Sequence, residues 1–283
     1  MQQRNNTHSS QKGFTLIELL IVIAIIAILT ALTVVIAGKI LDSAKSSKES
    51  GALRSVLQGY TLAATDRKGK LLIGYDSPDD IVKGFAGEVI DRNSPASWRY
   101  VFRILPYLDN AITSLYINDQ KSFLDSVDIT SEEYTYIATV FPSFGLNSTW
   151  LGGDKMTSNM EFLEPFKIAT NYLSGVRNPA NQLVFASAKA SLENTDSLPA
   201  EGHYKITSPY FINEGWYWEG EQGSFIPTNN SADHGFLSAR HESKVLTGQL
   251  DGSTTFQTIK ELLDMRKWNP KAKTSEWTPT VIP

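Results

Sequence analysis

A single apolar run near the N terminus dominates the hydropathy pattern of this sequence. Of the 24 residues from Phe14 to Ala37, 20 are apolar. As a helix, a run of this length extends about 36 Å, which is enough to cross the hydrocarbon core of a bilayer. The residues before the run are basic and include no acid, so the positive-inside rule leaves residues 1–13 in the cytoplasm. The pattern predicts a membrane-spanning helix over residues 14–37, with a globular part outside the cytoplasm.

Apolar residues recur at helical spacing beyond this run, which predicts an amphipathic continuation of the same helix. The predicted stripe consists of Ile40, Ala44, Ala52, Val56, Tyr60 and Ala63. The other faces carry Lys39, Lys45, Lys48, Glu49 and Arg54. Gly69 is placed to end the helix as a left-handed cap. We therefore expect one long helix over residues 14–66 and a head over residues 67–283.

The head has the signals of a mixed α+β domain. A short helix is predicted from Pro95 to Leu105, ending before Pro106. Strands are predicted at Glu133–Val140, Gln182–Ala188, Val245–Leu250 and Ser253–Ile259. Asp251-Gly252 joins the last two strands and predicts a two-residue type I′ hairpin turn. Long loops over 74–94, 142–165 and 190–232 separate these elements, and the tail from Trp268 shows little periodicity.

Composition and charge narrow the function classes. The chain has no cysteine, which excludes disulfides, thiolate zinc sites and cysteine nucleophiles. With 26 Lys and Arg against 30 Asp and Glu, the charge argues against a nucleic-acid partner. The sequence also lacks a G-x-S-x-G, a Walker loop, a dinucleotide fingerprint and an H-E-x-x-H motif. We therefore expect no enzymatic activity.

Glu18 distinguishes between interpretations of the apolar run. A secretory signal peptide would have a shorter apolar region and a small-residue cleavage site, which residues 33–39 do not provide. A plain membrane anchor leaves Glu18 unexplained, because an unpaired carboxylate in lipid costs ~2.5–3.5 kcal/mol or more. Cleavage between Gly13 and Phe14 would create an α-amine that could pair with Glu18 of a neighbouring, axially shifted helix.

Residues 12–20, Lys-Gly-Phe-Thr-Leu-Ile-Glu-Leu-Leu, resemble the prepilin cleavage and methylation motif of type IV pilins and type II secretion pseudopilins. The resemblance implies that a prepilin peptidase removes residues 1–13 as a leader and N-methylates Phe14. It also implies an α+β, pilin-like fold, in which the long N-terminal helix packs on an antiparallel β-sheet head with long loops. The implied partners are identical or related pilin subunits, joined through the helix, and an assembly platform in the bacterial inner membrane. The filament would be a periplasmic pseudopilus or a cell-surface pilus.

A second resemblance involves the C-terminal part. Nine residues separate His241 from Asp251-Gly252, which resembles an H-x9-D-G signature of a large group of pilin-like proteins. Residues 98–108 and 141–153 also resemble features of that group. If the residues from His241 to the turn form a strand, they span roughly 30 Å, so we do not expect His241 to pair directly with Asp251.

Four residues are candidates for a ligand or metal site: Asp233, His234, His241 and Asp251. Some pseudopilins use calcium to order a C-terminal loop, so the resemblance makes calcium the candidate cofactor. However, no EF-hand spacing is present, and two histidines without a third are a weak zinc pattern. Hydrogen bonding within loops is the alternative for all four. A hydrolase built on these residues would lack a recognisable nucleophile.

Trp216, Tyr217 and Trp218 form the densest aromatic group in the sequence. Exposed aromatic residues of this kind stack on sugars or bind a partner, whereas buried ones fill a core beneath long loops. The exposed alternative predicts a membrane-anchored, extracytoplasmic binding module for a glycan or a secreted substrate. It stands beside the structural subunit as the second functional hypothesis.

Overall fold

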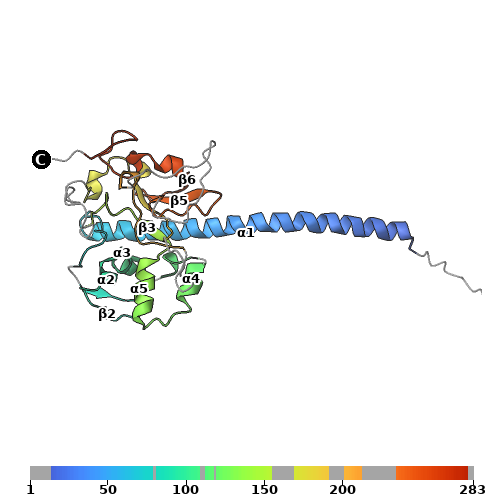
Figure 1. Cartoon of the computed structure of the whole chain (residues 1–283), viewed down its shortest axis with the longest axis horizontal. Helices are drawn as coiled ribbons and strands as arrows, with labels where there is room; N and C mark the ends of the chain where they lie inside the picture. Colours follow the sequence, from blue (N-terminus) through green and yellow to red (C-terminus); the bar gives the residue numbers. More distant parts are fainter. Residues whose placement is uncertain are drawn as a thin grey trace, which may run out of the picture. The chain divides into compact units, whose positions relative to one another are not determined.

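The computed structural model describes residues 14–78, 81–108, 112–117, 119–154, 169–190, 201–211 and 234–279. The chain divides into two compact units, Met1–Ser47 and Lys48–Pro283, and each is described by itself. Helix α1 (Leu16–Asp66) has 51 residues and extends through the division (Figure 1). The predicted leader, residues 1–13, lies outside the described residues.

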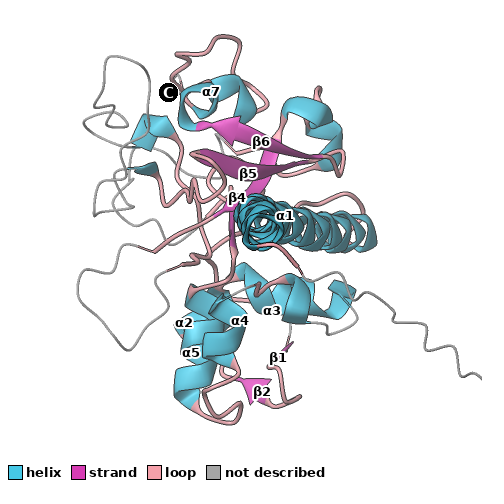
Figure 2. Ribbon diagram, turned by 90° about the vertical axis from the view of Figure 1, so that its right-hand side faces the viewer, coloured by secondary structure: helices cyan, strands magenta, loops and turns pink. Residues whose placement is uncertain are grey.

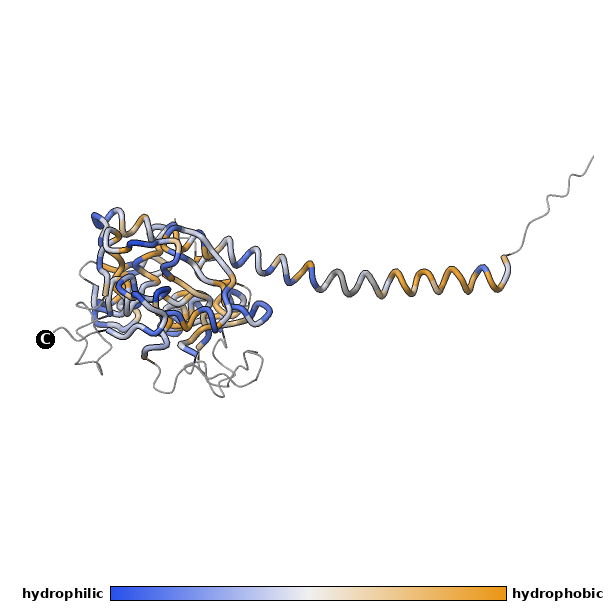
Figure 3. Tube along the Cα trace, turned by 90° about the horizontal axis from the view of Figure 1, so that it is seen from above, coloured by the Kyte–Doolittle hydropathy of each residue, from blue (hydrophilic) through white to orange (hydrophobic). Residues whose placement is uncertain are grey.

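In the first unit, α1 carries the apolar run, visible as the orange part of the helix in Figure 3. Its large apolar side chains are exposed, as illustrated by Leu16 at 85% and Ile28 at 61%. Within the part of the chain that is described, none of the helices combines the length and the hydropathy that a membrane crossing requires. Residues 32 and 34–37 lie outside those whose side chains are described. The span over 14–37 stays a prediction.

The remaining elements belong to the second unit. The helices are α2 (Pro95–Trp98), α3 (Tyr100–Ile104), α4 (Asp119–Leu124), α5 (Glu132–Val140) and α7 (Ile259–Leu262). The strands are β1 (Val82–Lys83), β2 (Val89–Ile90), β3 (Phe144–Leu146), β4 (Leu183–Ser187), β5 (Lys244–Gln249) and β6 (Thr254–Thr258). Short 3₁₀ helices cover Leu105–Leu108, Ile112–Ser114, Leu173–Gly175, Pro179–Asn181, Pro209–Phe211 and Met265–Lys267.

An antiparallel sheet forms the centre of this unit. Its order is β3-β4-β5-β6, and Figure 2 shows β4, β5 and β6. Ala186 is paired to Thr247, and Thr247 is paired to Thr255. All five residues of β4 are buried, as expected for a central strand covered on both faces. The long helix and the antiparallel sheet confirm the predicted fold class, an α+β, pilin-like arrangement.

Two hydrophobic clusters are built on the sheet. One contains Phe185 and Leu246 together with the buried face of α1, namely Leu53, Val56, Leu57, Tyr60, Ala63 and Ala64. The other contains Leu183 and Val245 together with Trp150 and Trp268. Trp268 has no exposed surface, so the tail that showed little periodicity in the sequence is part of the core. By contrast, Ile40 of the predicted stripe is 61% exposed.

Helix α1 ends in a Schellman motif. Gly69 N donates to Ala64 O at 2.7 Å, and Lys68 N donates to Thr65 O at 3.0 Å. Lys68 has φ +56° and Gly69 has φ +83°, so both adopt the left-handed conformation. The predicted stop at Gly69 is therefore correct in place, but Lys68 is the first left-handed residue.

Three local predictions need correction. Glu133–Val140 is the helix α5 instead of a strand, because Ser131 caps it through Tyr134 N (3.0 Å) and Tyr134, Ile137 and Ala138 are buried at helical spacing. The helix predicted from Pro95 is interrupted at Arg99, whose ψ of 152° is extended, and a 3₁₀ turn continues through Pro106. Two of the predicted loops contain strands: β3 lies within 142–165, and β1 and β2 pair within 74–94.

The hairpin between β5 and β6 is confirmed, but its turn is not type I′. Only Gly252 has positive φ (+88°), and Asp251 does not. Gly252 N donates to Gln249 O (3.0 Å), and Gln249 N donates to Ser253 O (2.9 Å). These bonds close a three-residue loop in which the glycine takes the left-handed position.

Two glycines of α1 provide a matched test of its packing. A Cβ at Gly51 would meet nothing within 4 Å, whereas a Cβ at Gly59 would lie 2.6 Å from Leu108 Cδ2. We expect Gly51→Ala to raise the free energy of unfolding by about 1 kcal/mol, the helix-propensity gain. Overpacking typically costs 1–3 kcal/mol, so we expect Gly59→Ala to be less stable than Gly51→Ala by about 1–2 kcal/mol. Urea unfolding of the detergent-solubilised chain measures both values, and equal values would contradict this packing.

Candidate functional sites

The N-terminal motif begins with a capping box at the start of α1. Glu18 N donates to Thr15 Oγ1 (3.2 Å), and Thr15 N donates to Glu18 Oε2 (2.8 Å). This reciprocal pair satisfies two amide groups that the first helical turn leaves without an intrahelical acceptor. Glu18 therefore has a partner within its own chain. The T-x-x-E spacing before an apolar run is the sequence signal that predicts such a capping box. Phe14 is 78% exposed, and Gly13 lies outside the described residues.

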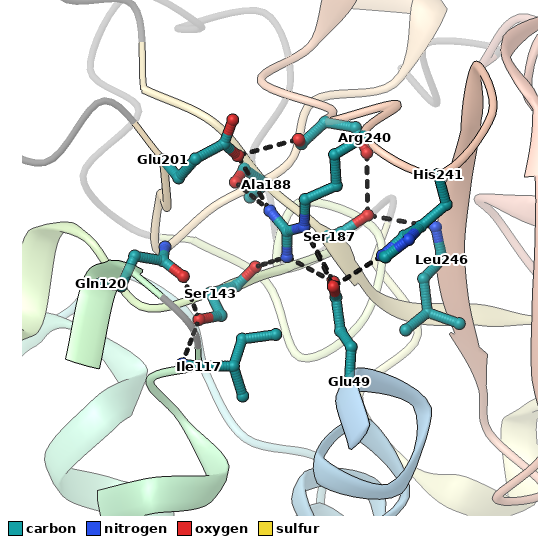
Figure 4. Close-up of polar contacts among 11 residues, drawn as sticks. Glu49, Ile117, Gln120, Ser143, Ser187, Ala188, Glu201, Arg240, His241 and Leu246 are labelled. Carbon is teal, nitrogen blue, oxygen red and sulfur yellow. Dashed lines mark hydrogen bonds and ion pairs between the residues drawn. The ribbon is translucent and has the colours of Figure 1, made fainter. Parts of the chain in front are cut away.

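A buried ion-pair cluster lies deeper in the second unit (Figure 4). We call Glu49, Glu201, Arg240 and His241 the Glu49 cluster. Glu49 has no exposed surface, although helical spacing had placed it away from the apolar stripe. Arg240 Nε donates to both oxygens of its carboxylate, at 3.0 and 3.1 Å, and Nη2 also donates to Oε1. The predicted position of Glu49 on a polar face is therefore wrong.

Arg240 connects this carboxylate to the surrounding loops. Its Nη1 donates to Glu201 Oε2 at 2.9 Å and to the carbonyl of Ala188 at 3.4 Å, and Nη2 donates to the carbonyl of Ser143 at 3.4 Å. The planar guanidinium allows these bonds to point to several partners at once. One side chain thus joins α1, the ends of β3 and β4, and the segment that begins at residue 201.

His241 reaches Glu49 from the turn that precedes β5. His241 Nε2 lies 2.6 Å from Glu49 Oε2, and the ring makes an edge contact with Phe256. Glu242 and Ser243 have φ of +48° and +62°, and His241 and Lys244 exchange two backbone hydrogen bonds, the pattern of a type I′ turn. Neither residue is one that favours positive φ, so this turn is strained. The contacts of Arg240 and His241 hold the chain in it.

The charges of the cluster are compensated inside the protein. Burial would raise the pKa of Glu49, but the hydrogen bond from His241 and the charge of Arg240 outweigh it, so the pKa is lowered from its usual 4.5. Burial would lower the pKa of Arg240, but the charge of Glu49 outweighs it and raises the pKa. Glu49 and Arg240 are therefore both ionised at neutral pH.

The other candidate residues serve separate parts of the structure. Asp251 accepts hydrogen bonds from Ser253 N (2.9 Å) and Ser253 Oγ (2.6 Å) in the hairpin turn, at the opposite end of β5 from His241. His234 is buried, and its carbonyl accepts a bond from Leu237 N (3.2 Å). Direct pairing of His241 with Asp251 was not expected and does not occur.

The metal and binding-surface predictions remain predictions. Among the described residues, no group of three or more His, Cys, Asp or Glu side chains is placed to hold a metal ion. Asp233 lies outside those residues, so the calcium site proposed from sequence is not tested. Trp216, Tyr217 and Trp218 also lie outside them.

The Glu49 cluster is suited to fixing the position of α1, because each side chain in it is engaged by others. Sequence reasoning missed Glu49 and Arg240. Glu49 is 191 positions from Arg240 in the sequence. Its helix carries other charged residues as well, so nothing in the sequence marks Glu49 as the one that is buried. The only signal was the position of Arg240 next to His241 of the H-x9-D-G pattern.

Removing the charge of Glu49 should destabilise the second unit. Glu49→Gln removes the buried carboxylate that Arg240 Nε and Nη2 bind and leaves Arg240 with the partly exposed Glu201, so we expect the free energy of unfolding to fall by about 3 kcal/mol. The lowered pKa of Glu49 means that its contribution is present above pH ~4.5 and is lost as the pH falls through the lower folded value. The difference between wild type and variant, measured by urea unfolding, should shrink as the pH falls below about 4.5.

Glu133→Gln is the matched control, because Glu133 is exposed in the first turn of α5. Glu133→Gln loses only the favourable interaction of the Glu133 charge with the dipole of α5, so we expect the free energy of unfolding to fall by less than about 1 kcal/mol. An equal loss in both variants would contradict the structural role assigned to Glu49.

Comparison with known proteins supports the N-terminal motif as a functional site. The prokaryotic N-terminal methylation motif matches residues 8–34, a range that includes Gly13, Phe14 and Glu18. No curated protein matches the chain, and no solved structure matches it either. The grouping based on H-x9-D-G therefore stays a prediction. The chain carries a prepilin-type N-terminal methylation motif on an α+β fold with a pilin-like arrangement.

Proposed function

We propose that this chain is a structural subunit that is processed by a prepilin peptidase and assembled into a filament. The filament is a type II secretion pseudopilus or a type IV pilus-like fibre. The observation that carries the proposal is the methylation motif at residues 8–34, which overlaps the start of the 51-residue helix α1. Before assembly the subunit lies in the bacterial inner membrane, with its head outside the cytoplasm.

Assembly depends on what Glu18 binds. Cleavage after Gly13 makes Phe14 the new N terminus, next to Thr15, whose amide already donates to Glu18. The new α-amine is a stronger, charged donor for a carboxylate than a backbone amide. In a bundle of α1 helices, the amine of one subunit would take Glu18 of another and so select the axial stagger between subunits. The capping box keeps the carboxylate partnered until then.

The Glu49 cluster supports this role from the head side. Glu49 on α1 is bonded to Arg240 and His241, which precede β5. A force applied along the second part of α1 is therefore transmitted to the sheet through ionic bonds as well as through apolar packing. The binding-module alternative depends on Trp216, Tyr217 and Trp218, and no observation on the described residues favours it.

Processing at the motif gives the first test. Intact-mass and N-terminal peptide analysis of the chain from native membranes should find a mature protein that begins at N-methylated Phe14. The same form should appear in the fraction sheared from the cell surface, or in a periplasmic filament. A chain that still begins at Met1 in every fraction would contradict the proposal.

Glu18→Ala tests the assembly step, with Thr15→Val as its matched control. Thr15→Val removes the two hydrogen bonds of Thr15 Oγ1 in the capping box, but only Glu18→Ala removes the carboxylate that would pair with the α-amine. Because a charge left unpaired in lipid costs ~2.5–3.5 kcal/mol, we expect Glu18→Ala to lower filament incorporation at least tenfold. Thr15→Val should stay within about threefold of wild type. Equal losses would mean that Glu18 acts only as a helix cap.

A further inference from the structure

A groove of about 940 Å³ opens beside the C-terminal end of α1 in the second unit. Its walls come from the residues that follow α1, from the hairpin of β1 and β2, and from α3 with the 3₁₀ turn after it. In Figure 2 the hairpin lies below α3. None of these walls belongs to the Glu49 cluster, so the groove needs an explanation of its own.

Most of the large buried side chains that line the groove are apolar, and Asp76 and the part-buried Arg103 are the polar exceptions. Leu71, Val82, Phe102 and Leu105 line it, and each is at most 8% exposed. Ile81 stands at the same wall and is 78% exposed, which is unusual for an isoleucine in a folded head. Apolar surface left open in this way, beside polar groups, is typical of a protein–protein contact.

Among the described residues, the rim of the groove is basic, because Arg67, Lys70 and Lys83 line it with side chains that are at least partly exposed. Arg103 also lines the groove but donates to backbone carbonyls, and Asp76 is the single carboxylate among the described lining residues. Asp79 and Asp80, which follow Pro78 in the sequence, lie outside the described residues and are left out of this comparison. An occupant that suits the described groove has an apolar tip surrounded by carboxylates.

Another surface of the same unit has this composition. The segment between α4 and α5, together with the first turn of α5, carries Ile129, which is 44% exposed, and four exposed acids, Asp125, Asp128, Glu132 and Glu133. We call these five residues the acidic corner. Lys121 pairs with Asp125 at 2.5 Å, and Asp128 accepts hydrogen bonds from Thr130 N (2.9 Å) and Thr130 Oγ1 (2.8 Å), which leaves Glu132 and Glu133 as the carboxylates for other partners. No residue of the acidic corner lines the groove of its own chain.

We propose that the groove receives the acidic corner of a second copy of this chain. Ile129 enters the apolar interior, and the carboxylates around it meet Arg67, Lys70 and Lys83. The proposal rests on the assembly function proposed above and adds a contact between heads to it. Because groove and corner are different surfaces, the contact is heterologous, and repeating it extends an open chain of subunits instead of closing a dimer.

The absence of cysteine makes a disulfide test specific. In the full chain, Ile81→Cys combined with Ile129→Cys should give a ladder of linked subunits when the filament fraction is oxidised. Val89→Cys combined with Ile129→Cys is the control, because Val89 is 69% exposed on the same hairpin but does not line the groove. This control pair should give at least fivefold less disulfide-linked ladder than Ile81→Cys with Ile129→Cys.

Charge reversal gives an independent measurement. Lys70→Glu with Lys83→Glu should lower the ladder of the Ile81→Cys, Ile129→Cys chain at least fivefold. Adding Glu132→Lys and Glu133→Lys should restore it to within twofold, because opposite charges then face each other again. Such a rescue also shows that the reversed chains fold.

The possible failures can be told apart. If filaments form from chains that begin at Phe14 but the groove pair gives no more ladder than the control, the contact is wrong and the assembly function stands. The contact is also wrong, and the assembly function still stands, if Lys70→Glu with Lys83→Glu leaves the ladder unchanged. The same conclusion follows if adding Glu132→Lys and Glu133→Lys does not restore the ladder. If unmodified chains form no filament at all, the assembly function fails, and the contact between copies fails with it.

Discussion

The burial of one carboxylate, Glu49, constrains the second unit of this protein. A charge without exposed surface is tolerated only when it is paired and hydrogen-bonded, and Arg240 and His241 supply both the charge and the bonds. Meeting this requirement aligns β5 with α1 and holds the strained turn at Glu242 and Ser243. Apolar contacts between α1 and the sheet are non-directional, whereas the hydrogen bonds to Glu49 add a directional constraint.

The same cluster relates the head to the proposed assembly. In a helical filament, the N-terminal part of each α1 would be held by neighbouring helices, so the head must be fixed firmly to the rest of that helix. Arg240 contributes by joining α1 to the ends of β3 and β4 as well as to the segment before β5. The capping box at Thr15 and Glu18 plays a complementary role, because it keeps a carboxylate hydrogen-bonded while its partner in a filament is still absent.

Several predictions from sequence succeeded because their signals are local. The long helix, the strands on either side of Asp251-Gly252 and the strand over 182–188 follow from periodicity, turn residues and β-branched composition. The prediction failed at α5, where β-favouring residues such as Tyr134 and Ile137 belong to a helix. There the Ser131 cap and burial along one helical face outweigh intrinsic propensity, which is a weak preference that tertiary packing can override.

The sequence alone determined the processing motif, the long helix and the mixed α+β class, because each depends on residues that are close together in the chain. Only the tertiary structure decided that Glu49 is buried, that Arg240 is its partner and that a basic, apolar groove forms beside the end of α1. The partners in these features come from segments far apart in the sequence, and local spacing carries no information about which distant side chain neutralises a buried charge. That choice is made when the chain folds, since an unpaired charge in the interior is too costly to remain.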